Sequence, residues 1–194
     1  SGAGKTVITL AIMRLLRKRG VKYQPAKSGP DYIDPKFHEV ASGESSVNLD
    51  AWAMRKEEIE NLAGSGNLVV EGAMGLFDGA GVSGVGSSAD LAKILSLPVI
   101  LVIDSGKTAH SIAAIVQGFK SFDNHVTVAG VILNRVASDR HLNILRAALS
   151  KIDVPLLGFL FKSNIFSLSE RHLGLVQASE KQNLEHWIDI VSVS

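Results

Sequence analysis

The sequence predicts an α/β fold with a parallel sheet, and two patterns support that class. Stretches of helical spacing alternate along the 194 residues with short, continuous apolar runs. A continuous apolar run, in contrast to alternating polar and apolar residues, is typical of a strand that is buried on both faces. Strands that are separated by helices are joined by right-handed crossovers, which make the sheet parallel and place helices on both of its faces.

The expected elements follow in order along the chain. Helical spacing predicts helices over residues 4–19, 55–63, 88–95, 110–122, 139–151 and 184–191. Apolar runs predict strands over residues 68–70, 98–103, 128–133 and 155–161, with a weaker candidate over 22–26. Residues 87–90 form the capping-box pattern that starts the helix over 88–95. The first helix has no strand in front of it, so we expect a truncated start that lacks the first strand of the sheet. No Pro/Ser-rich linker or internal repeat divides the sequence, which predicts a single domain over residues 1–194.

Composition and charge argue against several classes of protein. The chain contains no cysteine, which excludes disulfides, thiolate zinc sites, iron–sulfur clusters and a cysteine nucleophile within it. The net charge is +1 and no basic stretch is interleaved with aromatic residues, so we expect no nucleic-acid partner. No apolar run approaches the roughly 18 residues that span a bilayer, and no signal peptide is present. We therefore expect no membrane partner and a cytoplasmic location.

Residues 1–6 carry a phosphate-loop motif at the start of the first expected helix. They match the last six positions of the pattern G-x-x-x-x-G-K-[ST]. The backbone N–H groups expected to surround phosphate oxygens belong to Gly2, Ala3 and Gly4. Lys5 is expected to neutralise the β- and γ-phosphates, and Thr6 to place its hydroxyl on Mg²⁺. The alternative is a flexible Gly/Ser terminus, but the helix and the buried strands that accompany the motif favour a P-loop NTPase-type fold that binds ATP.

Two carboxylates, Asp31 and Asp34, lie between Pro30 and Pro35 after the weaker strand candidate. The prolines restrict the backbone and hold the acids close together, and such a pair can bind Mg²⁺ or orient the junction of nucleotide and substrate. Asp34 is equally explained as a helix N-cap followed by proline at the first helical position. Asp31 has no such explanation, so we weight it above Asp34.

Acidic residues also end two of the expected strands, because Glu71 and Asp104 each follow an apolar run. P-loop enzymes place at such a strand end a carboxylate that coordinates Mg²⁺ or its water, and periodicity does not choose between the two residues. Glu71 gains weight from the glycine-rich loop that follows it, from Gly72 to Gly86, since such a loop lets its backbone approach a ligand closely. Within this loop, Asp78 is explained equally well by a function or by an Asp-Gly turn.

Six blocks of the sequence together resemble the ATP-binding synthetase domain of the cobyrinic acid a,c-diamide synthase family. They are residues 1–6, 27–35, 48–50, 71–79, 130–134 and 170–175. The blocks G-P-D-Y-I-D-P and E-G-A-M-G-L-F-D-G are highly specific, and the resemblance covers nearly the whole chain. It implies an ATP- and Mg²⁺-dependent amidoligase of cobalamin biosynthesis, a carbon–nitrogen ligase that converts the side-chain carboxylates a and c of a corrinoid into amides through acyl phosphates.

The family also has a C-terminal glutaminase domain with a cysteine nucleophile, which releases ammonia from glutamine. Since this chain has no cysteine, we expect the glutaminase to be a missing half or a separate chain. The same motifs serve cobyrinic acid, hydrogenobyrinic acid and nickel-sirohydrochlorin, so the substrate stays open among these tetrapyrroles. A homodimer is also left open.

The resemblance implies a role for each candidate residue. It assigns Thr6, Asp31 and Glu71 to the metal. It assigns a catalytic role to Lys5, Asp31 and Glu71. Asp34 and Asp78 are placed near the acyl phosphate, where they would bind a second Mg²⁺ or orient ammonia and accept its proton. The residues placed at the substrate are Tyr32, Ile33, Gly75, Arg171 and His172. Asn134 is similar to the position that contacts adenine in related P-loop synthetases, although a polar strand-end turn would also explain it.

Two other functions are weighed against the amidoligase. A nucleotide-switch ATPase of the partitioning type shares the phosphate loop and the acid-ended strands, and dethiobiotin synthetase has a related fold but lacks the G-P-D-Y-I-D-P block. The remaining histidines show no metal-ligand spacing such as H-x-H or H-E-x-x-H, so we expect surface or helix residues at His38, His110, His125, His141 and His186.

Overall fold

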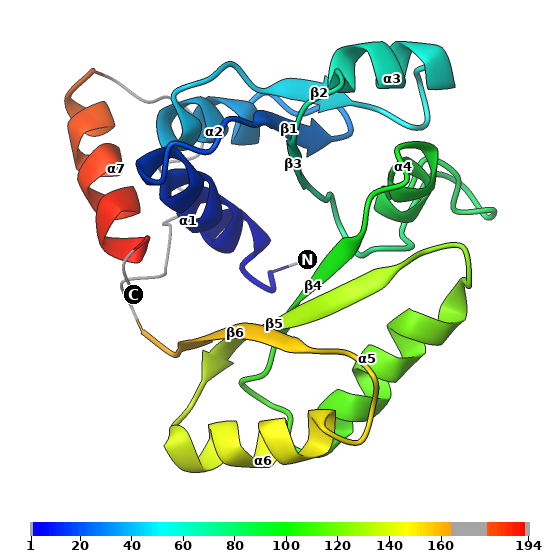
Figure 1. Cartoon of the computed structure of the whole chain (residues 1–194), viewed down its shortest axis with the longest axis vertical. Coiled ribbons are helices and arrows are strands. Elements are labelled where there is room, and N and C mark those ends of the chain that lie inside the picture. Colours follow the sequence, from blue (N-terminus) through cyan, green and yellow to red (C-terminus); the bar gives the residue numbers. More distant parts are fainter. Residues whose placement is uncertain (1, 164–177, 193–194) are drawn as a thin grey trace. The chain divides into compact units, whose positions relative to one another are not determined.

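The computed structural model describes residues 2–163 and 178–192 (Figure 1). The helices are α1 (Lys5–Lys18), α2 (Asp34–Ser42), α3 (Lys56–Ala63), α4 (Ser88–Ile94), α5 (Ser111–Phe122), α6 (Asp139–Leu149) and α7 (Ala178–Val191). The strands are β1 (Gln24–Ser28), β2 (Val47–Leu49), β3 (Leu68–Glu71), β4 (Val99–Asp104), β5 (Val128–Val136) and β6 (Leu156–Phe161). These elements form two compact units, one built from residues 5–95 and α7, the other from residues 2–4 and 96–163.

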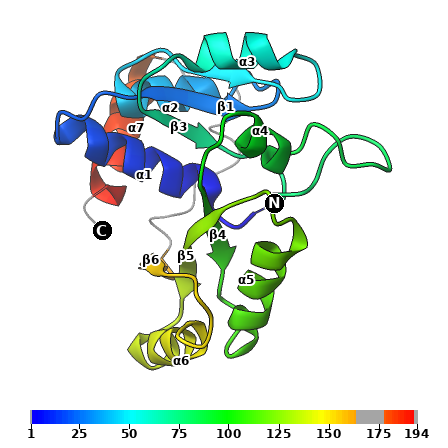
Figure 2. The same cartoon turned by 45° about the vertical axis from the view of Figure 1, so that its right-hand side comes forward.

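The first unit contains a parallel sheet in the order β2-β1-β3. Successive side chains of a strand point to opposite faces of a sheet, and β3 shows this directly. Val69 packs against the core formed with α1, α2 and α7, whereas Leu68 and Val70 pack against the core formed with α3 and α4. Helices therefore cover both faces of this sheet, and α1 and α3 lie on opposite sides of β1 and β3 (Figure 2).

Each face of the first sheet has its own apolar core. On one face, Leu10 and Met13 of α1 pack with Phe37 of α2 and Ile188 of α7, and all four are at most 2% exposed. Burial of such side chains stabilises a fold by about 1.5–3 kcal/mol each. This core fixes α1 and α2 against the sheet, so the residues at their N-terminal ends are held near the carboxyl ends of β1 and β3.

The second unit contains a parallel sheet in the order β4-β5-β6, with α5 and α6 in contact with β5 and with each other. The central strand carries the buried residues Val131, Leu133 and Val136. The expectation that every apolar run is buried on both faces is wrong for the outer strands, because Ile100 of β4 is 47% exposed and Leu157 of β6 is 52% exposed. A strand at the side of a sheet has a neighbour on one side only, so its side chains are less well covered.

The predicted elements are confirmed where a run or a helical face was long. The structure adds α2 and β2, which the sequence analysis did not predict, and it starts β1 at Gln24 where the weaker candidate began at residue 22. β1 has the sequence Gln-Pro-Ala-Lys-Ser, which offers no apolar run to recognise. Among the described residues, no helix has both the length and the apolar character needed to cross a membrane.

Candidate functional site

The predicted phosphate loop leads into α1, and its glycines have the backbone conformation that such a loop needs. Gly2 and Gly4 have φ angles of 80° and 90°, in the region that favours glycine. A Cβ at Gly4 would lie 2.2 Å from Nδ2 of Asn134, so a side chain has no room there. Asn134 of β5 donates Nδ2 to the carbonyl of Ala3 at 2.9 Å, and Arg135 donates to the carbonyl of Gly2 at 3.0 Å. Asn134, which the resemblance places at adenine, thus holds the backbone of the loop.

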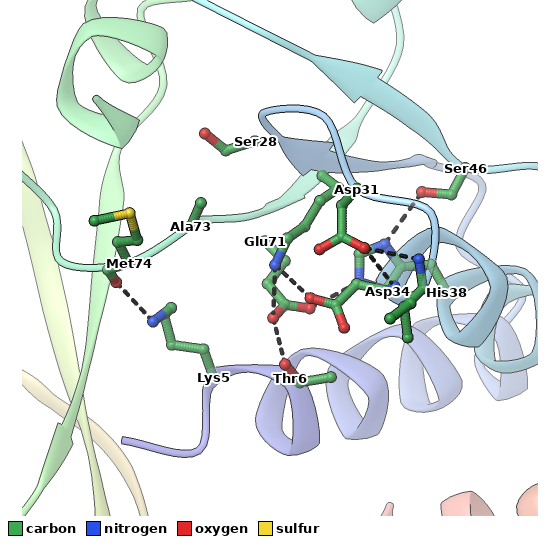
Figure 3. A network of polar contacts seen from close by, with 12 residues as sticks. Lys5, Thr6, Ser28, Asp31, Asp34, His38, Ser46, Glu71, Ala73 and Met74 are labelled. Carbon is green, nitrogen blue, oxygen red and sulfur yellow. Dashed lines mark hydrogen bonds and ion pairs between the residues drawn. The ribbon is translucent and has the colours of Figure 1, made fainter. Parts of the chain in front are cut away.

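The first two residues of α1 bind to β3 and to the loop after it (Figure 3). Thr6 Oγ1 donates to Oε1 of Glu71 at 2.6 Å, and Lys5 Nζ donates to the carbonyl of Met74 at 2.7 Å. Burial lowers the pKa of Lys5, although the nearby carboxylate of Glu71 acts in the opposite direction. The structure therefore joins the phosphate-loop hydroxyl directly to one of the two strand-end acids.

Glu71 is the centre of a buried polar network and is only 2% exposed. Its Oε1 also lies 3.2 Å from Nζ of Lys27, and its Oε2 lies 2.8 Å from Nε2 of His38. Burial by itself would raise the pKa of Glu71, but the hydrogen bond from His38, the charge of Lys27 and the hydrogen bond from Thr6 hold its pKa below the usual value. Both carboxylate oxygens are therefore engaged, and the charged form is favoured.

Lys27 joins Glu71 to a second carboxylate, that of Asp34. The parallel register places Lys27 of β1 opposite Glu71 of β3, and its Nζ lies 2.5 Å from Oδ2 of Asp34. Burial tends to lower the pKa of Lys27, but the two carboxylates outweigh burial and raise it. Burial and the charge of Glu71 raise the pKa of Asp34, and Lys27 only partly opposes them. The ammonium group of Lys27 therefore pairs with the buried Glu71 and with the half-buried Asp34.

The structure reverses the roles that local spacing suggested for Asp31 and Asp34. Oδ1 of Asp31 accepts hydrogen bonds from the N–H groups of Ile33 and Asp34 at 2.7 and 3.0 Å, so its carboxylate caps the turn that starts α2. Asp34 is the first residue of α2 and the N-cap position is Ile33, so the interpretation of Asp34 as an N-cap is wrong. Because Asp34 is inside the first turn, its side chain is free to reach the buried lysine.

His38 is a site residue that the sequence analysis placed among surface or helix histidines. It lies on α2 but is 0% exposed, and besides Glu71 it contacts Oγ of Ser46 through Nδ1 at 3.1 Å. Of the expected surface or helix position, the helix part is confirmed, but the side chain is not at the surface, because Asp34 and His38 are four residues apart on the same helix face and that face is turned toward β3. The i,i+4 spacing was the signal that could have linked the two residues.

The loop after Glu71 is closed by its own side chains. Oδ2 of Asp78 accepts from the N–H of Gly75 at 2.8 Å, and the N–H of Asp78 donates to the carbonyl of Gly75 at 3.2 Å. A Cβ at Gly75 would lie 2.5 Å from Oδ2 of Asp78, and Met74 next to it has a φ of 51°. Asp78 is exposed, and its charge acts on the pKa of Lys5. Asp78 therefore closes a turn and also lies close enough to Lys5 for its charge to act on that lysine.

Asp104, the other strand-end acid, has different partners. Its carboxylate forms an ion pair with Arg135 and accepts from the N–H of Gly106 at 2.9 Å, both within the second unit. Burial would raise the pKa of Asp104, but these two partners hold it below its usual value. In the part of the chain that the structure describes, no group of three or more His, Cys, Asp and Glu side chains could hold a metal ion. Thr6 and Glu71 of the predicted metal set are brought together, whereas the Asp31 carboxylate is bonded to backbone.

The residues expected at the substrate are only partly placed. Tyr32 is 90% exposed and Ile33 is 42% exposed, directly before the helix that carries Asp34 and His38. Arg171 and His172 lie outside the described residues. Two large apolar side chains in water beside a buried charged network are consistent with a surface that meets a ligand.

Comparison with known proteins agrees with this geometry. Residues 1–176 match the CbiA family, which is described as the CobQ/CobB/MinD/ParA nucleotide binding domain. The chain is 53% identical over 195 residues to a hydrogenobyrinate a,c-diamide synthase of Brucella anthropi, covering 97% of this chain and 44% of the relative. It is 52% identical over 194 residues to one of Rhizobium meliloti, again covering 97% of this chain and 45% of the relative.

A third relative, the hydrogenobyrinate a,c-diamide synthase of Rhodobacter capsulatus, is 46% identical over 199 residues, which cover 99% of this chain and 46% of that protein. The chain thus spans less than half the length of the relatives it matches. Because the family match covers most of the chain, and the phosphate loop and Glu71 have the contacts described above, the chain belongs to the CobQ/CobB/MinD/ParA nucleotide-binding domain family.

Proposed function

We propose that this chain is the ATP-dependent synthetase part of an a,c-diamide synthase that amidates a corrinoid in cobalamin biosynthesis. Hydrogenobyrinate is the first substrate to test, because it is in the names of the relatives at 46–53% identity. The reaction class is amide formation from a carboxylate, ATP and ammonia. Ammonia would be released from glutamine by a glutaminase outside this cysteine-free chain.

The phosphate loop and α1 would bind the nucleotide. The loop N–H groups and the N-terminus of α1 favour an anion, and Lys5 would exchange the carbonyl of Met74 for phosphate oxygens. Because burial lowers the pKa of Lys5, a bound phosphate would also stabilise its charged form. The positive charge of Lys5 and the N–H groups of the loop are needed, since the reaction brings an anionic carboxylate to an anionic nucleotide.

Thr6 and Glu71 fit a role at Mg²⁺. This ion prefers oxygen ligands, keeps several waters, and uses one or two carboxylates together with phosphates in nucleotide enzymes. A hydroxyl and an ionised carboxylate 2.6 Å apart supply that donor set, and a larger cluster of acids is not required. When bound, Mg²⁺ would neutralise phosphate charge and polarise the γ-phosphate.

The chemistry proceeds in two steps. A substrate carboxylate oxygen attacks the γ-phosphorus, the bond to the β-phosphate oxygen breaks, and ADP leaves. Ammonia then attacks the acyl carbon, phosphate departs, and the nitrogen loses a proton to give the neutral amide. Asp34 is better suited than Asp31 to accept that proton, because burial and the charge of Glu71 raise its pKa while the carboxylate of Asp31 is bonded to backbone.

The observation that carries this proposal is the network of Lys5, Thr6, Lys27, Asp34 and Glu71, where a phosphate loop, a buried carboxylate and a half-buried carboxylate occur together. A nucleotide switch needs the phosphate loop and one acid to read the nucleotide state. A second, half-buried acid with a raised pKa, beside exposed Tyr32 and Ile33, is what a carboxylate-activating enzyme adds.

The test is turnover with ammonium as the nitrogen source, which removes the need for a glutaminase. The chain is mixed with MgATP, ammonium and hydrogenobyrinate, and ADP is measured together with the mass of the corrinoid. We expect ADP formation that depends on both corrinoid and ammonium, with products in which one and then two carboxyl groups have become amides. Lys5→Ala should abolish turnover, because it removes the cation at the phosphates.

The same mixtures separate the alternatives. ATP-dependent dimerisation without any dependence on a small-molecule substrate would support a partitioning-type ATPase. Turnover with diaminopelargonate but not with the corrinoid would support dethiobiotin synthetase. Cobyrinic acid and nickel-sirohydrochlorin, assayed in parallel, identify which tetrapyrrole is preferred.

A further inference from the structure

His38 contacts the acid at the centre of the site but takes no part in the chemistry proposed above. It is 0% exposed on α2, in a helix whose neighbouring residues Phe37 and Ala41 belong to the apolar core. Burying a polar ring without partners costs free energy, and here both ring nitrogens have one. Nε2 lies 2.8 Å from Oε2 of Glu71, and Nδ1 lies 3.1 Å from Oγ of Ser46.

The two oxygens of Glu71 have separate sets of partners. Oε1 faces Thr6 and Lys27, at 2.6 and 3.2 Å, while Oε2 faces His38 (Figure 3). An ionised carboxylate can only accept hydrogen bonds, so the proton of this contact is on Nε2 of His38. Lys27 already supplies a cation to Glu71, and the contact that His38 adds is a directional one to the other oxygen.

We propose that His38 is a positioning residue that fixes the carboxylate of Glu71 so that Oε1 is presented to Thr6 and to the metal–nucleotide, and that Ser46 fixes the ring of His38 in turn. Without His38, Thr6 and Lys27 hold the carboxylate of Glu71 at Oε1 alone, so the group can rotate about its terminal torsion, which is broad for such groups, and its plane is no longer fixed. Groups that orient a metal-binding carboxylate are worth about 10- to 100-fold in metal affinity or activity.

This inference rests on the proposed function, since it assigns Glu71 to the metal that accompanies ATP. It assigns something further, namely that a buried histidine and a serine on neighbouring segments fix the orientation of the carboxylate plane of Glu71. Lys27 cannot replace them, because its Nζ contacts Oε1 and Asp34 and leaves Oε2 without a donor.

The experiment measures Mn²⁺ affinity in the presence of ADP, and ADP affinity in EDTA, for a matched pair of variants. The side-chain nitrogen of Gln occupies nearly the position of Nε2, so His38→Gln keeps a donor to Glu71. His38→Asn keeps a group near Nδ1 and loses the contact with Glu71. We expect His38→Asn to weaken Mn²⁺ binding by about 10- to 100-fold and His38→Gln to restore most of it, with ADP affinity in EDTA unchanged in both.

Two further variants complete the design. Ser46→Ala should give a smaller loss of Mn²⁺ affinity, because the ring keeps its contact with Glu71. His141 is a half-buried histidine in the first turn of α6, and His141→Gln is the control, which should bind Mn²⁺ as the unsubstituted chain does. In turnover, His38→Asn should lower kcat with little change in KM for the corrinoid, because the side chain of His38 is fully buried.

The outcomes distinguish this inference from the proposed function. Unchanged Mn²⁺ affinity in His38→Asn, or equal losses in His38→Gln and His38→Asn, overturns the positioning role while the proposed function stands. Loss of ADP affinity in EDTA together with Mn²⁺ affinity also overturns it, since that pattern means a merely structural histidine. Failure of the unsubstituted chain to bind Mn²⁺ with ADP overturns both.

Discussion

At the scale of single residues, the site is defined by one lysine between two acids. Lys27 is 5% exposed and lies within ion-pair distance of both Asp34 and Glu71. Burying charges is costly, and they are tolerated here because each acid has the lysine as a partner and Glu71 has further hydrogen bonds. The stability of this part of the fold and the charge of the site therefore depend on the same side chain.

Replacing Lys27 should be strongly destabilising. Lys27→Met keeps most of the volume but leaves the buried carboxylate of Glu71 and the half-buried carboxylate of Asp34 without their cation, and we expect a loss of about 3–5 kcal/mol in the free energy of unfolding. Urea unfolding followed by circular dichroism measures it. The control is Lys36→Met on α2, whose lysine is 71% exposed and pairs with Glu39 at 3.0 Å, and which should change stability little. Equal losses in the two variants would contradict this account of Lys27.

At the scale of elements, α4 shows how a local signal is realised. Oγ of Ser87 accepts from the N–H of Asp90 at 3.2 Å, and Oδ2 of Asp90 accepts from the N–H groups of Gly86 and Ser87 at 2.9 and 3.3 Å. The predicted capping box is thus confirmed. It satisfies backbone donors that the first turn of a helix leaves unpaired, and it ends the glycine-rich loop at a fixed point.

Removing the cap should cost stability in proportion to the bonds lost. Ser87→Ala removes the N-cap acceptor of α4, and we expect a loss of about 1 kcal/mol in the free energy of unfolding. Ser138→Ala at the start of α6 is a matched comparison, since Ser138 accepts from the N–H of His141 but is exposed, and the returning bond of His141 goes to the N–H of Ala137 and not to that of Ser138. Thermal unfolding should show a larger decrease for Ser87→Ala. A larger decrease for Ser138→Ala would contradict the importance of the reciprocal pair.

The capping box of α4 predicts that the stability of the fold depends on pH. Burial would raise the pKa of Asp90, but Lys93 and the N–H groups of Ser87 and Gly86 hold it below its usual value. A lowered pKa means that the unfolded chain takes up the proton first as the pH falls. The contribution of the Asp90 carboxylate to the free energy of unfolding is therefore fully present above its pKa in the unfolded chain, about 3.9. It is lost as the pH falls through the lower pKa of the folded chain.

The comparison with Asp90→Asn isolates this effect. The difference in unfolding free energy between the unsubstituted chain and Asp90→Asn should be constant above about pH 5 and should shrink at lower pH. Urea unfolding at a series of pH values gives this difference directly. A difference that grows as the pH falls would show that the pKa of Asp90 is raised instead.

At the scale of the whole molecule, the charges nearly cancel. Twenty Lys and Arg stand against nineteen Asp and Glu, and the isoelectric point is near 8.0. Net repulsion between copies is therefore weak at that pH, while Tyr32, Trp52 and Val82 expose apolar surface. A net charge away from zero favours solubility, so self-association should decrease as the magnitude of the net charge increases.

We expect self-association to be greatest near pH 8 and to fall toward pH 5.5, because the net positive charge of the chain grows as the pH falls below the isoelectric point. Static light scattering at constant ionic strength measures the average mass across this range. Added salt should reduce the difference in average mass between the two pH values, because it screens charge repulsion. An average mass that does not change with pH would contradict the role given to net charge.

The sequence by itself determined the α/β class, the phosphate loop, the strand that ends in Glu71 and the cap of α4. These follow from local patterns: continuous apolar runs, helical spacing and motifs of a few adjacent residues. β2, which has three residues, escaped it, and β1, whose sequence has no apolar run, was predicted only weakly and with its start two residues too early. Neither carries enough periodic signal to be separated from a loop.

Only the tertiary structure decided which polar residues meet. Glu71 contacts His38 across 33 positions of sequence and Lys27 across 44, because β1 and β3 are paired in register and α2 packs against them. Asp31 and Asp34, only three residues apart, were divided by the start of α2, which gave one carboxylate to the backbone and the other to the buried lysine. Local spacing indicates which side chains are available for chemistry, whereas burial and strand pairing decide which of them share a site.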